Sequence, residues 1–156
     1  MSVRIRLAGA ALLLCAGASA AFEISESALN DYVAQAIARK ATRDVQLLNP
    51  KVTLQDGYAK LCASLASSFL KRPVDFCADV TPVWRAESGS LHATKMALVS
   101  LDAPGVREKD IELLKSLVNQ LVLPGLDGVE VYRADSFIGK QLSWLTVLPG
   151  RLELGF

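Results

Sequence analysis

The chain has 156 residues, 51% of them hydrophobic, with 17 lysines and arginines against 16 aspartates and glutamates. This length fits one domain. The near-neutral charge argues against nucleic acid as a partner, because nucleic-acid-binding domains carry a basic face, and it also argues against strong attraction to anionic lipid headgroups.

The first twenty residues have the order of a secretory signal peptide. Arg4 and Arg6 form a basic start, residues 7–16 are apolar, and residues 18–20 are small enough for a cleavage site. Cleavage after Ala20 would leave one domain, residues 21–156, with 15 basic and 16 acidic residues. We therefore expect a periplasmic protein, and a buried N-terminal helix is the alternative interpretation of residues 1–20.

Cys15 raises the question of a lipid anchor. Leu12 fits the lipobox that precedes a lipidated cysteine, but Leu14, directly before Cys15, is larger than the residue that this position requires. Cleavage after Ala20 is the favoured prediction. We expect membrane association only if Cys15 is lipidated.

The clearest predicted helix runs from Phe22 to Lys40. Ser25 is a suitable N-cap. Apolar residues recur at helical spacing and predict a single buried stripe, made of Leu29, Tyr32, Val33, Ala36 and Ile37.

Strands follow, because the apolar period changes from 3.6 to 2. The first two, around residues 52–54 and 59–65, flank the tight-turn pair Asp56-Gly57, and a third covers residues 74–80. A further strand is expected over residues 91–101, and Asp102 to Gly105 should end it.

Cys62 and Cys77 test the pairing of the second and third strands. If they face each other in an antiparallel pair, Ala63 lies opposite Phe76 and Leu65 opposite Val74, so the pairs on the other face are all apolar. We therefore predict a Cys62–Cys77 disulfide on the outer face of the hairpin, which stabilises by about 3 kcal/mol in the chain-entropy model. Two free thiols are the alternative. No metal site is expected, because structural zinc needs four ligands.

The remaining chain predicts a helix over residues 107–122 that ends at Pro124-Gly125, and then a strand over residues 129–133. Asp135 or Ser136 is expected to cap a short helix through Leu142. A terminal hairpin, residues 145–156, should turn at Pro149-Gly150. The expected fold class is α+β in a single domain.

Several short motifs carry a resemblance to a known family. They are Phe22-Glu23-Ile24-Ser25-Glu26, Pro82-Val83-Trp84, Gly89-x-Leu91, Met96-x-Leu98, Tyr132-Arg133 and Pro149-Gly150-x-Leu152-x-Leu154-x-Phe156. In these motifs and in the order of its elements the chain resembles the YceB-like family of small bacterial envelope lipoproteins, a domain of unknown function. That family is similar to the tubular lipid-binding (TULIP) superfamily. The lipobox and the cysteine pair depart from the family pattern.

The resemblance implies a curved antiparallel meander sheet wrapped around a long N-terminal helix, with a second helix, a C-terminal hairpin and a groove for apolar ligands. The residues expected near that groove are Leu29, Tyr32, Val33, Ile37, Phe76, Val80, Trp84, Met96, Leu114, Leu117 and Val118. A dry core built from the same residues is the alternative.

The sequence does not favour an enzyme. It contains no nucleophile elbow, phosphate loop or His-Glu-x-x-His pair. His92 is the one histidine, and Asp75 and Asp79 share a strand face that we expect to be solvated. We expect no catalytic residues and no cofactor. The predicted function is periplasmic binding of a lipid or other hydrophobic molecule, as carrier or sensor, and the alternative is a protein-binding module for envelope assembly.

Overall fold

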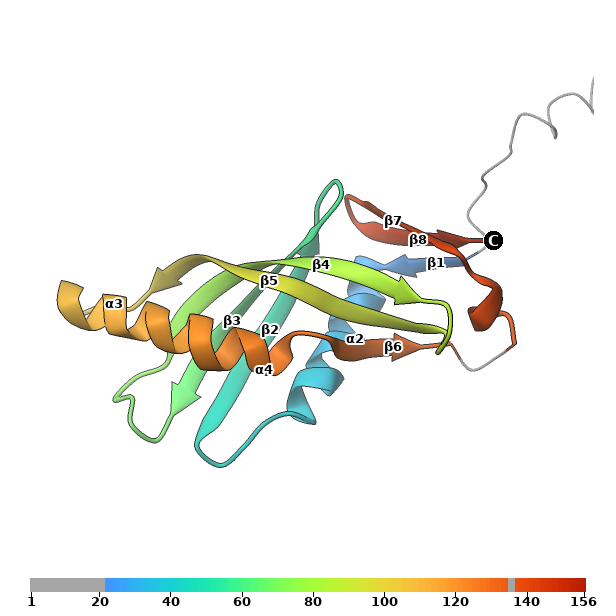
Figure 1. Cartoon of the computed structure of the whole chain (residues 1–156). Coiled ribbons are helices and arrows are strands. Elements are labelled where there is room, and N and C mark those ends of the chain that lie inside the picture. The colour runs from blue at the N-terminus through green and yellow to red at the C-terminus, as the bar shows by residue number, and fades with distance from the viewer. Residues whose placement is uncertain (1–21, 135–136) are drawn as a thin grey trace, which may run out of the picture.

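The computed structural model describes residues 22–134 and 137–156, and the protein has a mixed α+β fold with two antiparallel sheets (Figure 1). The predictions for the signal peptide, for Cys15 and for a cap at Asp135 or Ser136 lie outside these residues. The larger sheet is curled and has the order β2-β3-β4-β5-β6. Its strands are β2 (Val45–Leu54), β3 (Ala59–Ser67), β4 (Val74–Arg85), β5 (Ser90–Asp102) and β6 (Val129–Arg133).

A smaller sheet joins the two ends of the described chain in the order β1-β8-β7. Its strands are β1 (Phe22–Ser25), β7 (Trp144–Leu148) and β8 (Arg151–Gly155). The terminal hairpin is therefore confirmed, with its turn at Pro149-Gly150. The backbone N–H of Gly57, in the β2–β3 turn, donates to the carbonyl of Val147 at 3.0 Å and so ties the two sheets together.

The start of the first helix was predicted wrongly. Residues 22–25 form strand β1, and helix α2 (Glu26–Ala38) begins only after it. Ile24 pairs with Leu152 of β8 and is the single buried residue of β1, so sheet pairing overrides the helical tendency of this short segment. Ser25 is confirmed as the N-cap, since its hydroxyl accepts from the backbone N–H of Ala28 at 3.2 Å.

The predicted cysteine register is confirmed. Cys62 and Cys77 are bonded and directly opposed, and the same register places Ala63 opposite Phe76 and Leu65 opposite Val74. The alternate positions are buried on the inner face, while both cysteines are half-buried on the outer face. The disulfide therefore joins β3 to β4 on the outer face of the sheet, and the inner face remains available for packing against the helices.

The second helix continues beyond its predicted end. It comprises α3 (Glu108–Leu117), a π-helical turn (Val118–Val122) and α4 (Leu123–Leu126). Pro124 does not end the helix. It lies in the first turn of α4, directly after the π turn, and a proline is tolerated in a first turn because its missing N–H is not needed there for a helical hydrogen bond. The chain leaves the helix at the extended residue Asp127 and turns at Gly128, whose φ is 77°.

The two helices lie at different ends of the large sheet. Figure 1 shows α2 near the small sheet and α3 at the opposite end, with α4 between them. Within the described residues, no helix is long and apolar enough to cross a membrane.

Candidate functional site

An apolar cavity of about 50 Å³ lies between α2, the inner face of the large sheet and α4. It is lined by Leu29, Val33, Ala36, Ile37, Val52, Ala59, Leu61, Val80, Pro82, Leu91, His92, Ala93, Met96, Leu126, Val129 and Val131. An engineered apolar cavity of roughly 150 Å³ holds one benzene molecule. The interior cavity therefore has no room for a lipid chain in this conformation.

A larger apolar groove, of about 340 Å³, opens next to the cavity, between the end of α2, the start of β2 and the second helix. Its lining residues are Ile37, Lys40, Ala41, Thr42, Val45, Leu47, Phe69, Leu117, Leu121, Val122, Gly125 and Leu126. Binding sites for small molecules occupy roughly 300–1,000 Å³. Ile37 and Leu126 line both spaces, so these two side chains stand between the groove and the interior cavity.

A third space, called here the loop hollow, measures about 550 Å³ and continues beyond Phe69. It lies between the β3–β4 loop, residues 103–106 and Leu114 of α3. Phe69 lines both the groove and the loop hollow and is 61% exposed. Cavity, groove and loop hollow therefore form a row, with Ile37 and Leu126 at the first junction and Phe69 at the second.

The structure distributes the predicted groove residues over several places. Leu29, Val33, Ile37, Val80 and Met96 line the cavity. Ile37 and Leu117 line the groove, and Leu114 lines the loop hollow.

The other predicted residues line none of these three spaces. Phe76 and Val118 are 2% and 0% exposed and belong to the packed core. Tyr32 packs on Tyr132 with ring centroids 4.9 Å apart. Trp84 lies in a separate hollow beside β7.

Apart from Ile37 and Leu117, the expected residues did not include the side chains that line the groove. Leu121, Val122 and Leu126 come from the second helix, and Phe69 comes from the β3–β4 loop. Leu121 continues the stripe of Leu117 one turn further, so helical spacing was the available signal. The loop side chain had no such signal, because its approach to α3 depends on tertiary structure.

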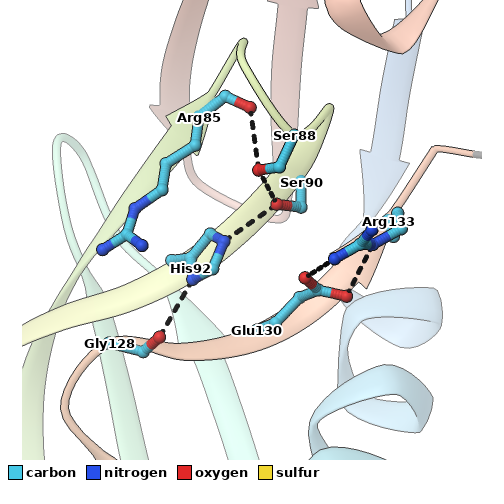
Figure 2. Close-up of polar contacts among 7 residues, drawn as sticks. All are labelled: Arg85, Ser88, Ser90, His92, Gly128, Glu130 and Arg133. Atoms are coloured by element: carbon cyan, nitrogen blue, oxygen red, sulfur yellow. Dashed lines mark hydrogen bonds and ion pairs between the residues drawn. The ribbon is translucent and has the colours of Figure 1, made fainter.

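His92 is held in a chain of hydrogen bonds at the edge of the cavity (Figure 2). Its Nδ1 lies 2.9 Å from the carbonyl oxygen of Gly128, which accepts only, so Nδ1 carries a proton. In the neutral ring Nε2 then accepts from the Ser90 hydroxyl at 2.8 Å, and Ser88 Oγ lies 2.5 Å from Ser90 Oγ. Ser90 is completely buried and offers no hydroxyl to solvent. The arrangement joins β5 to the turn after α4, which is a structural role.

The predicted carboxylates lie on the face opposite the cavity. Asp75 accepts a hydrogen bond from Ser64, and Asp79 is paired in register with Lys60. Both alternate with the buried residues of β4, as Cys77 does. They therefore contribute nothing to the cavity, the groove or the loop hollow.

No known protein family model matches the chain, and no curated protein matches it significantly in sequence. The cavity, the groove and the loop hollow are therefore the features of the molecule that point to a function.

Proposed function

We propose that this protein is a non-catalytic binding protein for a lipid or other hydrophobic molecule, acting as a carrier or sensor in the periplasm. The observation that carries the proposal is the contact between the interior cavity and the apolar groove at Ile37 and Leu126. Binding would bury apolar ligand surface, at about 25 cal/mol per Å². The groove has the size of a ligand site. An acyl chain bound there could extend toward the interior cavity.

The ligand would enter from the groove and displace the side chains of Ile37 and Leu126. Both are well buried, at 6% and 5% exposure, so the closed conformation is the one expected without ligand. The part that moves is α3, because α3 buries no residue and a π turn separates it from the buried residues of α4. Weakly packed elements open at low free energy, and π turns are frequent at functional sites.

Three further observations support this assignment. The resemblance to the YceB-like family implies a curved sheet that wraps around α2, and we interpret the curled large sheet in this way. The Cys62–Cys77 disulfide is typical of an oxidising compartment. The order of residues 1–20 predicts export.

Native mass spectrometry of the protein purified from a bacterial envelope, together with solvent extraction, tests the proposal. We expect an apolar molecule to co-purify with the protein, and a fluorescent fatty acid to bind after that molecule has been removed. The absence of a co-purified apolar molecule, combined with no uptake of fatty acids or phospholipids, would contradict the proposal.

Two leucines of the second helix provide a matched pair of variants. Leu113 and Leu121 are both 68% exposed, but only Leu121 lines the groove. Leu121→Gln should weaken binding of the fluorescent fatty acid about tenfold, which corresponds to about 1.4 kcal/mol of lost apolar contact. Leu113→Gln should bind like the unaltered protein.

The pair also separates the groove from other surfaces. Unchanged binding in both variants would place the ligand elsewhere. Equal loss in both would indicate that the outer face of the second helix makes the contact, as the alternative of a protein-binding module requires.

A further inference from the structure

The charged side chains that line the groove and the loop hollow are all cationic. Lys40 lines the groove, and Lys71 and Arg72 line the loop hollow. No aspartate or glutamate lines either space within the described residues. The nearest acidic residues along the sequence, Asp44, Asp75 and Asp102, lie outside both linings.

These cations have no carboxylate partner in the part of the chain that the structure describes. Other cations do: Arg107 pairs with Asp110 at 2.9 Å, and Lys115 pairs with Glu112 at 3.0 Å. Surface cations commonly find such partners at helical spacing. Lys40, Lys71 and Arg72 instead border apolar surface and remain available to an anion.

The other polar side chain of the groove is already engaged. The Thr42 hydroxyl donates to the carbonyl of Val45 at 3.3 Å and accepts from the N–H of the same residue at 3.1 Å. Lys40 is therefore the side chain in the groove that is free to bind a polar headgroup.

We infer that the ligand is an acyl-chain lipid with an anionic headgroup, whose chain occupies the groove and whose headgroup is bound by a cation of the two linings, Lys40 at the groove or Lys71 and Arg72 at the loop hollow. The inference rests on the proposed function and specifies its ligand. Charge-assisted hydrogen bonds to lysine and arginine favour carboxylate and phosphate. The near-neutral net charge of the chain opposes general adhesion to an anionic membrane, but it does not oppose local attraction of an anion where cations border apolar surface.

The inference is tested by comparing two probes that have the same acyl chain. The probes are a fluorescent fatty acid and its uncharged methyl ester. At low salt the acid should bind about tenfold more tightly than the ester, the difference that about one charge-assisted contact provides. Added salt should weaken binding of the acid but not binding of the ester, because salt screens the interaction between exposed charges.

Two triple variants locate the headgroup. The variant Lys40→Gln, Lys71→Gln, Arg72→Gln should bind the ester as before and lose the preference for the acid. The control variant Lys51→Gln, Arg85→Gln, Lys109→Gln removes three exposed cations that line neither the groove nor the loop hollow, and it should keep the preference.

Each contrary result has a distinct meaning. Equal affinity for acid and ester in the unaltered protein overturns the anionic headgroup and leaves the proposed function standing. A preference that survives in the first triple variant overturns the assignment to these three residues. Failure of both probes to bind overturns the proposed function and this inference with it.

Discussion

Helix α2 buries Leu29, Val33, Ala36 and Ile37 against the large sheet, whereas no residue of α3 is buried. Both helices have an apolar stripe, and both lie over the same sheet. The stripe of α2 is covered by the core, while the second helix leaves Leu113 and Leu121 exposed at 68% each.

Polar contacts increase the difference between the helices. Asn30 of α2 binds β2 twice, since its amide oxygen accepts from the N–H of Val52 at 2.7 Å and its amide nitrogen donates to the carbonyl of the same residue at 2.9 Å. The carboxylate of Glu26 accepts from the N–H of Leu54 at 2.9 Å. At α3 the N-cap residue Arg107 makes no capping hydrogen bond through its side chain. The contrast indicates that α2 is part of the scaffold, whereas α3, which contributes Leu117 to the groove lining, is only weakly attached.

The largest expected effect tests this division directly. Leu29→Ala should lower the free energy of unfolding by about 2–5 kcal/mol, because a leucine at 3% exposure leaves a cavity in the core. Leu121→Ala should change it by no more than about 0.5 kcal/mol, the range of exposed positions. Urea unfolding followed by circular dichroism measures both. Similar losses for the two variants would contradict the difference in packing between α2 and the exposed face of the second helix.

The disulfide fastens the sheet that both helices share. Replacing Cys62 and Cys77 together by serine should lower the free energy of unfolding by about 3 kcal/mol, because the unfolded chain regains the freedom of a loop of about fifteen residues. The difference between Leu29→Ala and Leu121→Ala should persist in this background, since distant effects add. Loss of that difference would show that the disulfide positions one helix specifically.

Asn30 tests the polar attachment of α2. Asn30→Ala should cost about 2 kcal/mol, because the N–H and carbonyl of Val52, a residue only 5% exposed, both lose their side-chain partner. Ser27, one helical turn earlier and exposed, provides a control in Ser27→Ala, which should be nearly neutral. Equal stability of the two variants would remove Asn30 from the account of why α2 is fixed.

Sequence patterns predicted the parts of this comparison that depend on local periodicity. The register at Cys62 and Cys77 followed from pairing the two cysteines and from the apolar alternation, because a shift by one residue would expose every inward side chain of β3. The stripe of α2 followed from helical spacing. Strand β1 could not be predicted from spacing, because its partner β8 is more than 120 residues away in the sequence and four residues are too few to show a periodic pattern.

The groove could be predicted only in part. Leu117 was expected near a ligand and does line the groove, but the sequence gave no way to separate side chains that fill the core from side chains that border a gap. Phe76 and Val118 were expected near a ligand and are packed in the core, whereas Phe69 lies in a loop and lines the groove. Which residue borders empty space depends on how closely the two helices approach the sheet, and that distance is a tertiary property.

The smallest expected effect concerns an electrostatic link between α2 and the edge strand β6. A hydrogen bond from Arg133 lowers the pKa of Glu130 below its usual value of 4.5, desolvation opposes this shift, and the charges of Arg133, His92 and Arg39 assist it (Figure 2). A carboxyl whose pKa is lower in the folded state stabilises the fold above its unfolded pKa and loses that contribution as the pH falls through the folded value. Because the Glu130 side chain is 35% exposed, we expect only about 0.5 kcal/mol.

Glu130→Gln should therefore be slightly less stable than the unaltered protein at pH 7, and the difference should disappear as the pH falls through the folded pKa of Glu130. Arg39 belongs to the end of α2, so Arg39→Gln should raise the pKa of Glu130 slightly, and Lys109→Gln on α3, whose charge has no part in this shift, should leave it unchanged. Carboxyl titration by nuclear magnetic resonance reads these pKa values directly. A pKa for Glu130 at or above 4.5 would contradict the shift, and an equal response to both substitutions would show that the charge of Arg39 at the end of α2 does not reach β6.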